Sequence, residues 1–148
     1  MLIAHAIVQT RVQRESSMNK PLIKKIDCVQ FYVSDLESGI KFYRALGHSQ
    51  KCRTDHSAGF QMPETDAEIV IQTNRREQET DLLVDSVDSA VKRIVDAGAS
   101  LVVPPFEIQV GKCAVIIDPW GNKLVLLDLS KGMLRTDSSG KVVDQNLP

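Results

Sequence analysis

Polar side chains alternate with apolar ones along three segments of the sequence, and these polar residues could do chemistry. The apolar residues are of the kind that pack in a core, such as Val29 and Phe31 in the first segment and Ile69 and Ile71 in the second. Because successive side chains of a β-strand point to opposite faces, burying the apolar set leaves the polar set on the other face. The polar or reactive positions are Cys28, Gln30, Tyr32, Glu68, Gln72, Glu79 and Asp81. We therefore expect one sheet face that is polar, partly acidic and free of histidine.

Several of these positions allow two interpretations. Glu68 and Glu79 could form a carboxylate pair for proton transfer at a carbon atom, or they could be solvated acids at strand edges. Cys28 could be a ligand or nucleophile, but free cysteine is more often a small buried residue. Gln30 and Tyr32 could donate hydrogen bonds to a ligand or line a wet sheet face.

An internal repeat predicts the elements that position these residues. The segment 33–47 aligns without gaps on the segment 84–98, and each copy has an Asp/Ser helix start, an apolar face at helical spacing and a terminal glycine. Each helix follows a strand. Three strand-like runs follow each helix: 49–53, 59–62 and 67–73 in the first copy, and 100–103, 109–117 and 123–129 in the second. Each copy is therefore a βαβββ module, and two modules must share a sheet to be stable.

Two short motifs carry a resemblance to a known superfamily. Val33-Ser34-Asp35-Leu36 followed by Phe42-Tyr43 and Leu46-Gly47, and later Asp118-Pro119-Trp120-Gly121-Asn122, resemble the glyoxalase, bleomycin-resistance and extradiol-dioxygenase (vicinal oxygen chelate) superfamily. The resemblance implies an α+β fold in which two paired βαβββ modules form a curved, cup-shaped mixed sheet with helices on the convex side. It also implies a small-molecule cavity on the concave face, pairing into a homodimer, and commonly a divalent metal.

The family's metal positions can be compared with this sequence. They correspond to Cys28, to Glu79, to Val125 and to either Glu68 or Val70. Because valine supplies no ligand atom, we expect the usual metal site to be incomplete, with Glu79, Glu68 and Cys28 as ligands if a metal binds. The ligand cavity is expected to be lined by Cys28, Gln30, Tyr32, Glu68, Gln72, Glu79 and Asp81.

These observations leave two classes of function. The first is a protein that binds a small organic molecule without a metal cofactor. The second is a divalent-metal-dependent lyase, isomerase or dioxygenase with a remodelled site, whose catalytic residues the sequence does not identify. A structural or interaction module is a third interpretation, and it predicts no open pocket.

Composition and charge limit the possible partners and location of the protein. The 148 residues carry 18 Lys+Arg against 19 Asp+Glu, interspersed along the chain, which argues against nucleic acid as a partner. Three widely spaced cysteines and no long apolar run predict a cytoplasmic protein that does not enter a membrane. We expect an N-terminal extension over 1–21, a domain over 22–130 made of modules 22–75 and 76–130, and a frayed tail over 131–148.

Overall fold

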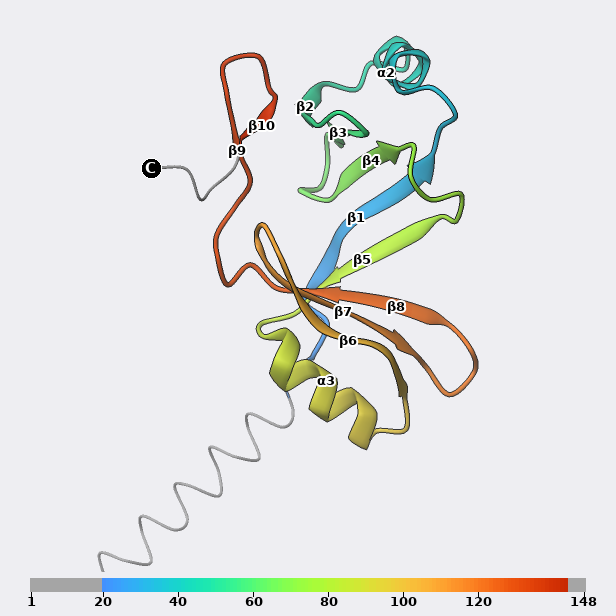
Figure 1. Ribbon diagram of the computed structural model, residues 1–148, viewed down its shortest axis with the longest axis vertical. Helices are drawn as coiled ribbons and strands as arrows, with labels where there is room; N and C mark the ends of the chain where they lie inside the picture. Colours follow the sequence, from blue (N-terminus) through green and yellow to red (C-terminus); the bar gives the residue numbers. More distant parts are fainter. Residues whose placement is uncertain (1–19, 144–148) are drawn as a thin grey trace, which may run out of the picture.

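A computed structural model of the chain, which describes residues 20–143, contains one large mixed sheet and two helices (Figure 1). The sheet order is β2-β3-β4-β1-β5-β8-β7-β6. Its strands are β1 (Lys25–Tyr32), β2 (Gln50–Arg53), β3 (Ser57–Gln61), β4 (Glu68–Gln72), β5 (Glu79–Leu83), β6 (Ser100–Ile108), β7 (Gly111–Ile117) and β8 (Lys123–Leu127), and its helices are α2 (Leu36–Ala45) and α3 (Val87–Asp96). The predicted α+β architecture of two βαβββ modules is confirmed.

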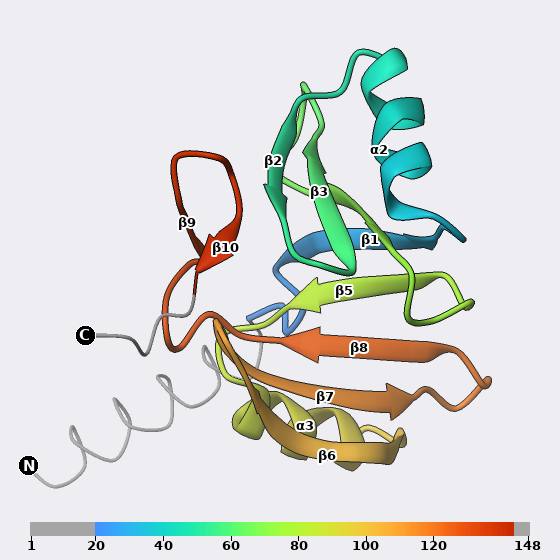
Figure 2. The same ribbon diagram turned by 45° about the horizontal axis from the view of Figure 1, so that its top comes forward.

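The two modules meet inside one chain. In each module the first strand pairs with the last in parallel, β1 with β4 and β5 with β8. The modules are then joined by antiparallel pairing of β1 with β5, which lie side by side at the centre of the sheet in both views (Figure 2). The sequence left open whether the modules pair within or between chains, and the topology shows that they pair within the chain.

Both helices begin and end as the repeat predicts. The side chain of Asp35 accepts a hydrogen bond from the backbone N–H of Ser38 at the start of α2, and Ser86 accepts from Ser89 at the start of α3. Each helix is followed by a glycine with positive φ, Gly47 at 92° and Gly98 at 113°. Such a conformation is readily available only to glycine, so these residues stop the helices.

Two apolar clusters lie between the helices and one face of the sheet. Helix α3 packs on a cluster that includes Ile116 and Leu126, and α2 packs on a cluster that includes Phe60 and Ile71. Strand pairing connects Ile71 to Phe31 and Leu82 to Leu126, so both helices cover the same face. The opposite face is left for the candidate site.

The predicted apolar stripe of α2 is too wide. Leu36 and Ile40 are buried and Tyr43 packs against the cluster, but Phe42 and Leu46 are each 58% exposed. Phe42 lies beside the stripe on the helix surface, where its ring contacts the edge of Tyr43 at a centroid distance of 5.2 Å. Phe42 of the Phe42-Tyr43 motif is therefore a surface residue, and Tyr43 is the one that packs.

The expected frayed tail is wrong for the residues that the structure describes beyond Ser130. Residues 131–143, which we call the C-terminal strap, end in a hairpin of β9 (Arg135–Thr136) and β10 (Val142–Val143). The carboxylate of Asp137 holds the hairpin turn by accepting hydrogen bonds from the backbone N–H groups of Ser139 and Lys141. Polar composition favours disorder in a free segment, whereas here the polar side chains form the hydrogen bonds of a turn.

The strap returns to the first module, where Lys141 bridges to Arg53 in β2. The expected N-terminal extension lies mostly outside the described residues. No helix within residues 20–143 has the length and apolar character needed to cross a membrane.

Candidate functional site

The uncovered face of the sheet carries the polar residues that strand alternation predicted. Strand pairing places Cys28 opposite both Glu68 and Asp81, and Gln30 opposite both Val70 and Glu79. Side chains of paired residues point to the same face. Tyr32 lies opposite Gln72 on the same face.

A β-bulge adds one carboxylate to this face. The register between β1 and β5 shifts between Ile26 and Cys28, so Asp27 has no partner in the ladder. A bulge breaks the alternation of side chains and re-aims the extra residue. Strict alternation would direct Asp27 toward the helices, but its side chain instead lines the same cavity as Glu68 and Asp81.

Four of the predicted residues form one hydrogen-bonded cluster at the centre of the sheet. The side-chain N–H of Gln30 donates to Asp81 Oδ2 at 2.8 Å and to Glu79 Oε1 at 3.4 Å. The thiol of Cys28 donates to the same Asp81 oxygen at 3.2 Å. Arg75 completes the cluster by donating to the side-chain oxygen Oε1 of Gln30 at 3.0 Å and by pairing with Glu79 at 3.2 Å.

Asp81 is the carboxylate of this cluster whose charged form is disfavoured by burial. Its side chain is 7% exposed, and burial raises the pKa of its carboxyl to about 6. The hydrogen bonds from Gln30 and Cys28 oppose this rise, while the neighbouring Glu79 adds to it. Its Oδ1 atom is buried and has no hydrogen-bond partner among the described residues.

The surroundings of Cys28 favour its neutral thiol form. Burial raises the pKa of Cys28 far above its usual range, and the charge of Asp81 raises it further. The thiolate is the reactive and metal-binding form of cysteine. In this arrangement Cys28 acts as a hydrogen-bond donor to Asp81.

The remaining predicted residues have local partners. Gln72 accepts hydrogen bonds from the backbone N–H groups of Asn74 and Arg75 at 2.7 Å and donates to the carbonyl of Arg75, so it holds the loop after β4. The ring of Tyr32 lies under the guanidinium of Arg76, 5.5 Å from its carbon atom. Glu68 pairs with Lys51 at 2.6 Å.

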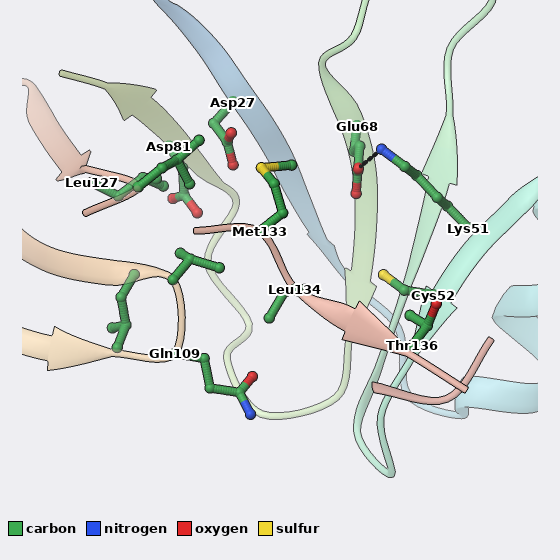
Figure 3. A pocket seen from close by; sticks show the side chains of 13 residues that line it. Asp27, Lys51, Cys52, Glu68, Asp81, Gln109, Leu127, Met133, Leu134 and Thr136 are labelled. Carbon is green, nitrogen blue, oxygen red and sulfur yellow. Dashed lines mark hydrogen bonds and ion pairs between the residues drawn. The ribbon is translucent and has the colours of Figure 1, made fainter. Parts of the chain in front are cut away.

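A cavity of about 370 Å³ lies where the uncovered face meets the strap and the β6–β7 hairpin (Figure 3). Figure 3 shows Asp27 and Asp81 toward one end, and the Lys51–Glu68 pair with Cys52 toward the other. The lining residues are Asp27, Lys51, Cys52, Glu68, Asp81, Ile108, Gln109, Val110, Leu127, Leu129, Met133, Leu134 and Thr136.

Of the seven residues expected to line a ligand cavity, Glu68 and Asp81 line this one. Glu79 lies instead at a second hollow with Lys123 and Val125. Cys28 and Gln30 lie behind Asp81 as its hydrogen-bond donors. The sequence reasoning missed the strap residues, because their pairing is not encoded in an alternating pattern.

The fold and these motifs can now be compared with known proteins. The model of the glyoxalase-like domain family matches residues 28–127. This chain belongs to the glyoxalase-like domain family. The resemblance seen in the two short motifs is thereby confirmed, and a comparison with curated protein sequences found no match.

Solved structures of the wider superfamily share the fold of this glyoxalase-like chain. Methylmalonyl-CoA epimerase from Mycobacterium tuberculosis is 18% identical with a TM-score of 0.60, over 77% of this chain and 95% of its own. The Mn(II)-bound glyoxalase from Novosphingobium aromaticivorans is 18% identical with a TM-score of 0.54, over 79% of this chain and 43% of its own. An extradiol ring-cleaving dioxygenase from B. fuscum is 18% identical with a TM-score of 0.56, over 74% of this chain and 33% of its own.

The structure decides which residue of β4 corresponds to the family's metal position. The two modules are offset by 51 residues in the repeat, so that Val33 corresponds to Val84. Gln30 pairs with Val70 in the first module, and its counterpart Asp81 pairs with Val125 in the second. Val70 is therefore the counterpart of Val125, and Glu68 is not at the metal position.

The four family positions in this glyoxalase-like domain are then Cys28, Val70, Glu79 and Val125. Two of them are valines, which have no ligand atom, and the third is a thiol whose neutral form is favoured. The alternative ligand Glu68 is paired with Lys51. Within residues 20–143, no three His, Cys, Asp or Glu side chains are placed to hold a metal ion.

Proposed function

We propose that this glyoxalase-like chain binds a small organic molecule in the cavity beneath the C-terminal strap, without the family's metal. The observation that carries the proposal is the cavity itself. Six apolar side chains line it, and its charged groups come from strands β1, β2, β4 and β5 of the sheet. Binding sites for small molecules are typically apolar hollows with a few placed polar groups.

The side chains that could ligate a metal favour binding of an organic molecule over metal-dependent catalysis. The lyases, isomerases and dioxygenases considered from the sequence require a divalent ion with several converging ligands. Here Glu79 is engaged by Arg75 and Lys123, and Glu68 by Lys51, so the carboxylates are already neutralised by protein cations. A metal would have to displace those pairs and also deprotonate Cys28.

A fluorescent apolar probe tests whether the cavity binds ligands. We expect the neutral fluorophore N-phenyl-1-naphthylamine to bind the full chain with saturable fluorescence enhancement. Replacing Leu134, which lines the cavity, with tryptophan should fill the space and weaken binding by about tenfold or more, which is ~1.4 kcal/mol.

Leu101→Trp provides the matched control. Leu101 is 42% exposed and Leu134 is 43% exposed, but Leu101 lies on the edge strand β6 and does not line the cavity. Its substitution should leave probe affinity unchanged. Absence of saturable binding, or equal loss in both variants, would refute the proposed cavity.

A further inference from the structure

The cavity carries an excess of negative charge. Three carboxylates line it, from Asp27, Glu68 and Asp81, against the single ammonium of Lys51. Lys51 lies 2.6 Å from Glu68 and offsets that charge. Among the described residues, neither Asp27 nor Asp81 forms an ion pair. An occupant that enters this space therefore meets two carboxylates without a direct ion pair, of which Asp27 is also influenced by the charges of Lys25 and Lys51.

Asp81 supplies an independent sign that a hydrogen-bond donor is missing. The residue is 7% exposed, and its Oδ2 accepts bonds from Gln30 and Cys28, while Oδ1 has no partner within residues 20–143. Leaving a buried acceptor without a partner forfeits its hydration with nothing in return, so such atoms are rare in folded proteins. Figure 3 shows the Asp81 carboxylate directed toward the cavity.

The other walls define the rest of the occupant. Leu127 and Leu129 from β8 and its continuation, with Met133 and Leu134 from the strap, surround the acidic end with apolar surface. A hydrated inorganic cation would leave this surface uncovered. An apolar body attached to the cation would cover this surface and remove it from water, which is favourable.

We propose that the cavity selects an organic cation, a primary or secondary ammonium group carried on an apolar body. The ammonium pairs with the carboxylate of Asp81 and is also attracted by Asp27, while the body packs beneath Met133 and Leu134. This inference rests on the proposed function, since it names the class of ligand that the same cavity takes. An organic anion of equal size is excluded by the two carboxylates.

Three probes of matched length test the charge preference. Hexylammonium, hexan-1-ol and hexanoate are titrated into the full chain at about pH 7.5 by isothermal calorimetry. We expect hexylammonium to bind at least ~10-fold more tightly than hexan-1-ol, because a hydrogen bond between charged groups is stronger than one between neutral groups. Hexanoate should show no binding.

Substitutions assign the preference to the named residues. Asp81→Asn should abolish the preference for hexylammonium over hexan-1-ol while retaining hexan-1-ol binding. Asp27→Asn should weaken the binding of hexylammonium by a smaller factor. Glu64→Gln removes the same charge from an exposed loop residue that does not line the cavity, and it should leave the preference intact. A thermal melt of each variant verifies folding, and Asp27→Asn keeps the test available if Asp81→Asn does not fold.

The possible failures are distinguishable. Equal binding of hexylammonium and hexan-1-ol, both weakened by Leu134→Trp, would overturn the cation inference and leave the proposed binding function standing. Loss of the preference in Glu64→Gln would also overturn it, since the effect would then come from overall surface charge. If none of these molecules and no N-phenyl-1-naphthylamine bound, the proposed function would fail together with the inference.

Discussion

The buried carboxyl of Asp81 works against folding in the absence of a ligand. Its pKa is raised from 3.8 to about 6, chiefly by burial, so the folded state holds its proton more tightly than the unfolded state does. The free energy of unfolding therefore falls as the pH rises from about 4 to 6 and remains lower above that range. A group retained at such a cost is typical of a functional site.

Asp81→Asn should consequently stabilise the ligand-free protein above pH 6. The amide keeps an acceptor for Gln30 and Cys28 but no longer has to ionise in a buried place. We expect the free energy of unfolding to rise by about 1–3 kcal/mol at pH 7.5 and the difference to disappear below pH 4. Urea denaturation at the two pH values measures this. A variant that is less stable at pH 7.5 would contradict the interpretation of Asp81.

Residue positions were predictable where the strand is regular. Cys28, Gln30, Glu79 and Asp81 share the uncovered face because alternation holds from Cys28 onward. Asp27 was missed because a bulge interrupts that alternation. The residue type itself indicated a bulge, since with regular alternation an aspartate between Ile26 and Cys28 would point into the helix-covered core.

At the scale of elements, Asp128 connects α3 to the sheet. It is 3% exposed, and its carboxylate accepts hydrogen bonds from the backbone N–H of Val87 at 2.8 Å, of Lys112 at 3.0 Å and of Ser130 at 3.2 Å. Gly111 permits this approach, because a Cβ there would lie 2.3 Å from Asp128 Oδ1.

We expect Asp128→Ala to lower the free energy of unfolding by about 2–4 kcal/mol, since it leaves several backbone donors without a partner. Asp137→Ala is the matched control. Asp137 also accepts from several groups, but its residue is exposed in the strap turn, where water replaces the lost bonds. Equal effects of the two substitutions in urea denaturation would contradict the connecting role of Asp128.

The strap is the element on which the cavity depends most. It supplies Met133, Leu134 and Thr136 to the lining, yet it contributes no residue to the buried core. A chain that ends at Ser130 should therefore fold, with a melting temperature lowered by only a few degrees, and should lose N-phenyl-1-naphthylamine binding by about tenfold or more. Full probe affinity in the shortened chain would show that the strap does not form the binding site.

Helix boundaries followed from the repeat and from helix caps, both of which are local signals, whereas the strand expected over 100–103 extends to Ile108 as β6. Asp35, Ser86, Gly47 and Gly98 act as the sequence predicts. The strap hairpin was not predicted, because its bridge to Arg53 joins residues far apart in the chain. A short polar segment gives no periodic signal of such a contact.

At the scale of the whole molecule, the two modules already complete one sheet within a chain. A homodimer stays a prediction from the family resemblance, as does a cytoplasmic location. Sedimentation equilibrium tests the first, since a dimer has twice the 16.4 kDa of the chain. A single species of 16.4 kDa across micromolar concentrations would remove the dimer.

The central claim is that a superfamily known for metal sites has here a metal-free cavity for an organic ligand. Elemental analysis of the purified, untagged protein, followed by thermal melts with Mn, Ni, Zn, Fe(II) and Mg, tests it most directly. We predict no stoichiometric metal and no stabilisation by any of these ions, because Val70 and Val125 stand at two of the four positions. One equivalent of metal, or a rise of several degrees that Glu79→Ala abolishes, would contradict the account.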